Sequence, residues 1–141
     1  MIVNEAELNA MSSLALAHMG DAVYELLVRT MLCRAGKLTA GDLHRLTIRY
    51  VSARAQASAA KKLLPNLSEQ ELTVFRRGRN AHSHSAPKAV TEGEYHAATG
   101  LEALFGWLYL REDKDRIRQL FDLIMEEDDA AGRDGAHGDL P

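Results

Sequence analysis

Apolar residues recur at intervals of three and four along nearly the whole chain, which is the spacing of helices with one buried face. The strongest stretch begins near Ser12 or Ser13, either of which suits an N-cap, and runs to Cys33, with Gly36 placed to end the helix. Only residues 46–51 have the β-branched character of a strand, and they are short and flanked by helical pattern. The pattern therefore predicts an all-α protein.

Capping signals divide the rest of the chain into further helices. Two of them are capping boxes, in which a Ser or Thr is followed three residues later by a Glu. The predicted helices begin behind Thr39, Ser52, Ser68, Thr91 and about Asp113, and the last one ends near Glu127. Residues 82–88 form the one evident loop. We expect a single domain over residues 1–127 and a polar, disordered tail over residues 128–141.

Size and composition are those of one folded domain with its own core. The chain has 141 residues, of which 46% are hydrophobic and 26% charged. No apolar run approaches the ~20 residues of a membrane span, and the first residues lack the cationic and apolar segments of a signal peptide. The single Cys33 can form no internal disulfide. These features predict a cytoplasmic protein without a membrane association.

Charge is distributed unevenly along the chain. The formal net charge is −3, but residues 26–90 contain twelve Lys or Arg against three acids, a balance of +9, and the remainder carries −12. A basic segment of this kind can contact the phosphates of a nucleic acid, because a polyanion responds to the local potential. Helices with solvated basic faces would give the same count.

Two acidic residues lie where a buried helix face is expected. Asp21 follows Gly20 in the middle of the first long helix, and Glu102 lies in an apolar segment with Gly106 one turn away. Small residues let two helices pack closely enough to bring these acids together. A divalent cation such as Mg²⁺ would relieve the repulsion between them, since it is commonly held by one or two carboxylates. The alternative is that each acid is buried against an arginine.

Glu25 has two interpretations. It lies one turn after Asp21, where it could join a metal site, and one turn before Arg29, where it would form an ion pair on the helix surface. The four-residue spacing favours the ion pair.

Four stretches, in this order, resemble the catalytic domain of ribonuclease III. The resemblance is strongest to Mini-ribonuclease III, the bacterial subfamily that lacks a double-stranded-RNA-binding domain. The stretches are residues 14–25 (LALAHMGDAVYE), 42–44 (DLH) with 51–53 (VSA), 77–81 (RGRNA) followed by 87–88 (PK), and 99–110 (TGLEALFGWLYL). The resemblance covers roughly residues 12–125 and implies the all-helical ribonuclease III endonuclease fold, assembled as a homodimer.

The resemblance also implies an activity. Members of this family cut double-stranded RNA with Mg²⁺, for which Mn²⁺ is an alternative, and leave a 5′-phosphate and a 3′-hydroxyl. The subfamily is associated with maturing the ends of large-subunit ribosomal RNA precursors. By motif, Asp21 and Glu102 match the two acids required for metal binding and catalysis. Whether a ribosomal protein assists is left open.

The chain departs from the larger ribonuclease III enzymes, which carry four acids in these motifs. Here Ala17 and Thr99 occupy two of the four positions, as in the Mini-III subfamily. The resemblance therefore identifies only two of the metal ligands. We expect no appended RNA-binding domain, as in the Mini-III subfamily, so affinity would come from the basic middle of each subunit. The candidate RNA-binding residues are Arg76, Arg77, Arg79, Asn80, His82 and Lys88. The same polar and basic residues would also be expected in a solvent-exposed loop, or at the C-terminus of a helix, where a positive charge is favourable.

Two other functions fit parts of this pattern. One is a non-catalytic double-stranded-RNA-binding ribosome-assembly factor on the same fold. The other is an all-α, metal-dependent nucleotide hydrolase, which would usually need more carboxylates at helical spacing and would not need a basic middle.

Overall fold

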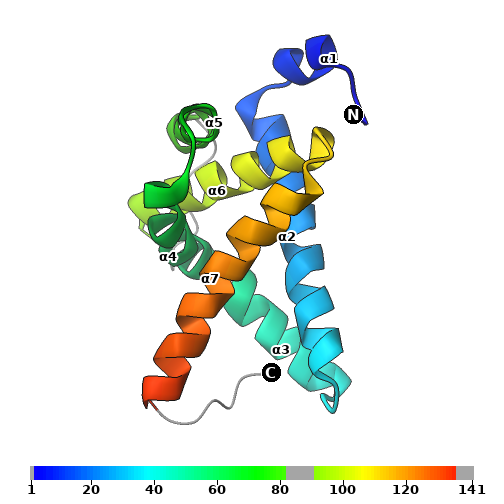
Figure 1. The fold of residues 1–141 in the computed structure, drawn as a ribbon, viewed down its shortest axis with the longest axis vertical. Coiled ribbons are helices and arrows are strands. Elements are labelled where there is room, and N and C mark those ends of the chain that lie inside the picture. Colours follow the sequence, from blue (N-terminus) through cyan, green and yellow to red (C-terminus); the bar gives the residue numbers. More distant parts are fainter. Residues whose placement is uncertain (1, 82–90, 136–141) are drawn as a thin grey trace.

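The structure, a computed structural model, describes residues 2–81 and 91–135, with side chains described up to residue 126 (Figure 1). Within these ranges it contains helices and no strand, which confirms the predicted all-α class. The elements are α1 (Glu5–Ala10), α2 (Ser13–Ala35), α3 (Ala40–Val51), α4 (Ala53–Leu63), the 3₁₀ turn η1 (Leu64–Asn66), α5 (Glu69–Asn80), α6 (Glu92–Leu110) and α7 (Lys114–Gly135).

The helix starts follow the capping signals of the sequence. In each case the side-chain oxygen of the N-cap residue accepts a hydrogen bond from a backbone N–H of the first turn, which satisfies one of the orphan donors there. These N-cap residues are Ser12, Thr39, Ser52, Ser68 and Thr91. Gly36 ends α2 with a φ of 71°, a conformation that glycine adopts without strain.

Two elements differ from the prediction. Helix α1 was not predicted, because its six residues are too few to show a helical period. Only its capping box, Asn4 with Glu7, marks it in the sequence. Helix α7 continues to Gly135 rather than ending near Glu127, so residues 128–135 are helical. Polarity does not prevent this, since Ala130 and Ala131 are strong helix formers. The expected loop at 82–88 and the rest of the expected tail lie outside the described residues.

Helix α6 is the centre of the fold, with α2, α4, α5 and α7 packed around it (Figure 1). Every residue from Ala98 to Leu108 is buried except Glu102. A helix that is apolar on all sides has to be enclosed in this way. The ring of Tyr24 meets Phe105 edge-on, with centroids 5.4 Å apart, and also meets Phe121 of α7 at 5.8 Å. These contacts join α2, α6 and α7 in one core.

Helices α2 and α6 cross at two glycines. A Cβ atom at Gly20 would overlap the carbonyl oxygen of Glu102 and lie 2.8 Å from the backbone nitrogen of Gly106. A Cβ atom at Gly106 would likewise overlap the carbonyl oxygen of Leu16. The two backbones are therefore closer than any residue with a side chain would permit at either position.

Helix α5 also approaches α6 through a glycine. A Cβ atom at Gly78 would lie 2.7 Å from the Ala103 Cβ and 3.0 Å from the Gly100 Cα. The C-terminal end of α5 therefore rests against the turn of α6 that carries Glu102.

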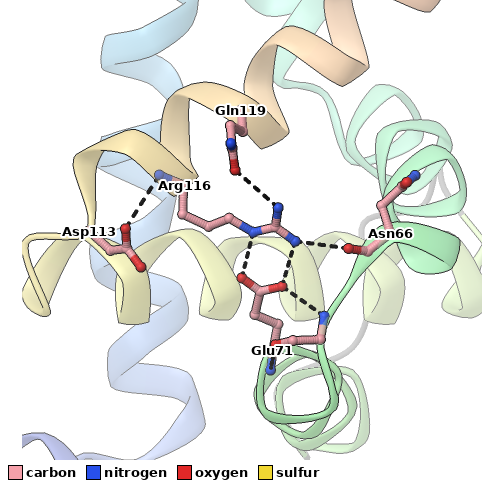
Figure 2. A network of polar contacts seen from close by, with 6 residues as sticks. Asn66, Glu71, Asp113, Arg116 and Gln119 are labelled. Atoms are coloured by element: carbon pink, nitrogen blue, oxygen red, sulfur yellow. Dashed lines mark hydrogen bonds and ion pairs between the residues drawn. The ribbon is translucent and has the colours of Figure 1, made fainter.

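A polar network fixes the other end of α5 to α7 (Figure 2). Arg116 donates two parallel hydrogen bonds to the Glu71 carboxylate, from Nε and Nη2, each 2.8 Å long. Nη2 also donates to the carbonyl oxygen of Asn66 at 2.8 Å, and Nη1 to Gln119 at 3.2 Å. These hydrogen bonds to Arg116 hold the pKa of the buried Glu71 below its ordinary value. The pair thus satisfies a carboxylate that is buried at the start of α5.

The glycine crossing can be tested with two variants in the same helix. Gly106→Ala should lower the free energy of unfolding by at least ~2 kcal/mol, because the new methyl group must push α2 away. Gly93→Ala is the control, since a Cβ there meets nothing within 4 Å. It should leave stability unchanged or raise it by up to ~1 kcal/mol. Urea unfolding measures both, and equal effects would contradict the crossing.

Candidate functional site

The structure brings the side chains of Asp21 and Glu102 together. Asp21 lies on the exposed face of α2, directly after Gly20, and Glu102 is half-buried on α6. Because the backbone of Gly20 lies against that of Glu102, neighbouring side chains at the crossing can meet. The two carboxyl groups share a hydrogen bond.

The pair has an unusual electrostatic state. Burial raises the pKa of Glu102 to about 8, and the charge of Asp21 and the hydrogen bond to Asp21 act in the same direction. Each effect penalises the ionised form of Glu102. At neutral pH, the metal-free protein therefore favours the protonated form of Glu102.

Arginine does not neutralise either acid within the described part of the chain. The ion pairs found there involve other carboxylates. Glu25 forms one of them, with its Oε2 3.0 Å from Nη2 of Arg29, which confirms the surface ion pair favoured by the spacing. Glu102 differs in this respect from Glu71, whose burial is compensated by Arg116.

One neighbour of Glu102 was missed by the sequence analysis. Gln56 of α4 is only 2% exposed, and its amide lies close enough to the Glu102 carboxyl group to lower the pKa of Glu102 as a hydrogen-bond donor does. Its Nε2 nevertheless does not reach the geometry of a hydrogen bond with any described residue. The signal was available, because Gln56 is in register with the buried Ala60 and Leu63 on the inner face of an alanine-rich helix. A lone amide at an apolar position of that kind needs a hydrogen-bond partner, as a lone acid does.

The donor set fits a hard divalent cation. Two carboxylates without a basic partner lose their mutual repulsion when a cation replaces the shared proton. In the residues that the structure describes, no cluster of three or more His, Cys, Asp or Glu side chains surrounds a metal position. Ala17 is buried, and the hydroxyl of Thr99 donates to the carbonyl oxygen of Tyr95 at 3.0 Å. Mg²⁺ suits such a sparse set, since waters and phosphate oxygens usually complete its shell.

The candidate RNA-binding residues that the structure describes lie at the C-terminal end of α5. Arg76, Arg77, Arg79 and Asn80 are all exposed there. The guanidinium of Arg79 lies 5.9 Å from the centroid of the Phe75 ring and donates to Oδ1 of Asn80 at 3.3 Å. His82 and Lys88 lie outside the described residues. The described group forms a basic end of α5 next to the Glu102 turn of α6.

A search of the described helices finds none that is long and apolar enough to span a membrane.

Comparisons with known proteins agree with this architecture. The family model of the ribonuclease III domain matches residues 14–113. The chain is 50% identical over 107 residues to Mini-ribonuclease 3 of Symbiobacterium thermophilum, covering 76% of this chain and 82% of that protein. It is 41% identical over 119 residues to Mini-ribonuclease 3 of Enterococcus faecalis, covering 83% and 90%.

A solved structure shows the same fold. Protein FN1578 from Fusobacterium nucleatum superposes with a TM-score of 0.78 and 27% sequence identity, covering 86% of this chain and 98% of that one. Ribonuclease III enzymes act on double-stranded RNA, generally depend on divalent metals and are typically dimeric. The match to the family model and the identity to these relatives show that the chain belongs to the ribonuclease III family of endoribonucleases.

Proposed function

We propose that the protein is a Mg²⁺-dependent endoribonuclease that cuts double-stranded RNA and matures the ends of large-subunit ribosomal RNA precursors. The observation that carries the proposal is the hydrogen-bonded pair of Asp21 and Glu102, which no arginine or lysine neutralises within the described residues. The ribosomal substrate is what the resemblance to the Mini-ribonuclease III subfamily implies.

The two acids would contribute to cation binding in different ways. Glu102 projects from a buried helix, so its position is set by the core, while Asp21 faces solvent, where an RNA phosphate must arrive. When bound, Mg²⁺ supplies a Lewis acid for the scissile phosphate and lowers the pKa of its own water. The products would be a 5′-phosphate and a 3′-hydroxyl, and Mn²⁺ would substitute for Mg²⁺ because it accepts the same oxygen ligands.

RNA would reach this site along the basic end of α5. Duplex RNA is recognised mainly through its shape, phosphates and 2′-hydroxyls, because its major groove is too narrow for side chains. Exposed Arg76, Arg77, Arg79 and Asn80 offer donors to phosphates next to the turn of α6 that carries Glu102. On sequence grounds, His82 and Lys88 belong to the same proposed surface.

A second copy of the chain would pack against the exposed apolar side chains around Leu26, beyond Asp21 along α2, and form the homodimer. Leu26 is 63% exposed. Leu26 also borders a groove with Leu27 and Tyr109. Apolar area of this kind favours association with another protein surface. A mass of one chain by light scattering would contradict the dimer.

The metal site is tested by three substitutions in the same two helices. Asp21→Asn and Glu102→Gln should each reduce cleavage of duplex RNA in Mg²⁺ by at least ~100-fold, because each removes a cation ligand while keeping side-chain size. Glu25→Gln is the matched control, since Glu25 lies one turn from Asp21 but pairs with Arg29. Its cleavage rate should remain within about threefold of the wild type, a cost of under ~1 kcal/mol.

Mapping RNA ends tests the substrate in the same experiment. Wild-type protein incubated with precursor ribosomal RNA should produce the mature large-subunit ends with 5′-phosphates, and Asp21→Asn should not. Cleavage at the parental rate by either acid variant would overturn the site. Cleavage of other duplexes without these ends would overturn the ribosomal role alone.

Metal binding should be coupled to proton release. The pKa of Glu102 is about 8 in the metal-free protein, so a cation must displace its proton at lower pH. Metal affinity should therefore rise with pH up to about pH 8 and then become constant. Calorimetric titration of Mn²⁺ at pH 7, in buffers of different ionisation enthalpy, should count close to one proton released. A metal affinity that does not change with pH would contradict a raised pKa of Glu102 in the metal-free protein.

The same shift predicts how stability changes with pH. Between the unfolded pKa of 4.5 and the folded pKa of about 8, the folded state holds a proton that the unfolded chain has released. The contribution of Glu102 to the free energy of unfolding therefore falls as pH rises through this window. Glu102→Gln should gain ~1–3 kcal/mol relative to the wild type between pH 5 and pH 8.5, measured without metal.

The RNA surface is tested by salt dependence. In an Asp21→Asn background, which keeps the duplex intact, Arg76→Ala with Arg77→Ala should weaken binding and reduce the slope of log affinity against log salt concentration by about 1–2. Arg118→Ala, which removes an exposed arginine of α7, is the control and should leave the slope unchanged. If both variants had the same slope, the RNA-binding surface would have to lie elsewhere on the protein.

A further inference from the structure

Gln56 is the one buried side-chain group left unsatisfied in the described part of the chain. It is 2% exposed, and its Nε2 has no hydrogen-bond partner there. The other side chains on that face of α4 are apolar, among them Ala57, Ala60 and Leu63. A buried donor without an acceptor destabilises a fold, and an apolar residue would avoid the loss. Packing alone therefore does not account for a glutamine at this position.

The surroundings of Gln56 identify the acceptor that it would use. Helix α4 packs on α6, and the Gln56 amide lies close enough to the Glu102 carboxyl group to interact with it, although its Nε2 does not reach the geometry of a hydrogen bond. A carboxylate accepts hydrogen bonds at both oxygens, whereas a carboxyl group that holds a proton has less capacity to accept. The unpartnered N–H of Gln56 is thus matched to the carboxylate of Glu102, its neighbour on α6.

We propose that Gln56 is a positioning residue for Glu102, whose buried amide donates a hydrogen bond to the Glu102 carboxylate in the cation-bound state and sets the direction in which that carboxylate faces Asp21. The inference rests on the proposed metal site. Such outer partners orient metal ligands and prevent them from rotating away from the cation. Gln56 would act through Glu102 and would not itself touch the cation or the RNA.

A positioning role for Gln56 can be distinguished from a structural role, because the two roles predict different effects of a substitution on stability and on metal affinity. Gln56→Met keeps an unbranched side chain of similar length and removes the donor. The metal-free variant should unfold at the same temperature as the wild type or higher, because an unsatisfied buried group has been replaced by an apolar one. Its dissociation constant for Mn²⁺, measured by electron paramagnetic resonance with the metal alone, should rise by about 10- to 100-fold.

Thr47→Val is the matched control for burial. Thr47 is also a buried polar residue, but its hydroxyl donates to the carbonyl oxygen of Leu43 within α3, at 2.7 Å. This substitution should leave Mn²⁺ affinity unchanged. Cleavage by Gln56→Met should recover as Mn²⁺ is raised towards saturation, since the variant retains both cation ligands.

The outcomes distinguish this inference from the proposed function. If the Asp21→Asn variant binds Mn²⁺ as tightly as the wild type, the proposed metal site is wrong. If Asp21→Asn abolishes binding but Gln56→Met binds as tightly as the wild type, only the role of Gln56 is wrong. A Gln56→Met protein that loses affinity together with metal-free stability would also overturn that role, because the glutamine would then act through packing.

Discussion

The close approach of α2 and α6 is the constraint on which the candidate site depends. Gly20 and Gly106 allow the two backbones to touch, and a single methyl group at either position would separate them. The same contact places Asp21 beside Glu102, although the two residues lie in different helices far apart in the chain. A helix-interior glycine costs stability compared with alanine, so its use here is explained by the geometry that it permits.

Among the described residues, Glu71 is buried and Glu102 is half-buried, and the fold treats these two carboxyl groups in opposite ways. Glu71 receives two hydrogen bonds from Arg116, and its pKa is lowered, as expected for an acid that serves as a structural anchor (Figure 2). Glu102 faces another acid, and its pKa is raised. The first arrangement is complete within the chain, whereas a cation would stabilise the second. This contrast is the physical basis for assigning a functional role to one acid and a structural role to the other.

Helix α5 connects the Glu71–Arg116 pair with the turn of α6 that carries Glu102. The Glu71–Arg116 pair attaches the beginning of this helix to α7, and Gly78 attaches its end to α6. The exposed arginines at that end therefore have a defined position relative to Glu102, although they belong to a separate helix. The proposed RNA-binding surface and the proposed metal site would need a constant separation, and these two attachments provide it.

The sequence alone determined the helical class and most helix starts, because capping is local: Ser52, Ser68 and Thr91 act on N–H groups three residues away. It also indicated the two acids, through small residues beside each and through resemblance to a family. It did not reveal α1, which is too short for a period, or the continuation of α7 to Gly135, since polar residues form helices as well as tails. Only the tertiary structure decided that Asp21 and Glu102 share a hydrogen bond and that Gln56 is buried beside them, because such contacts depend on how helices pack across the core and not on neighbours in the chain.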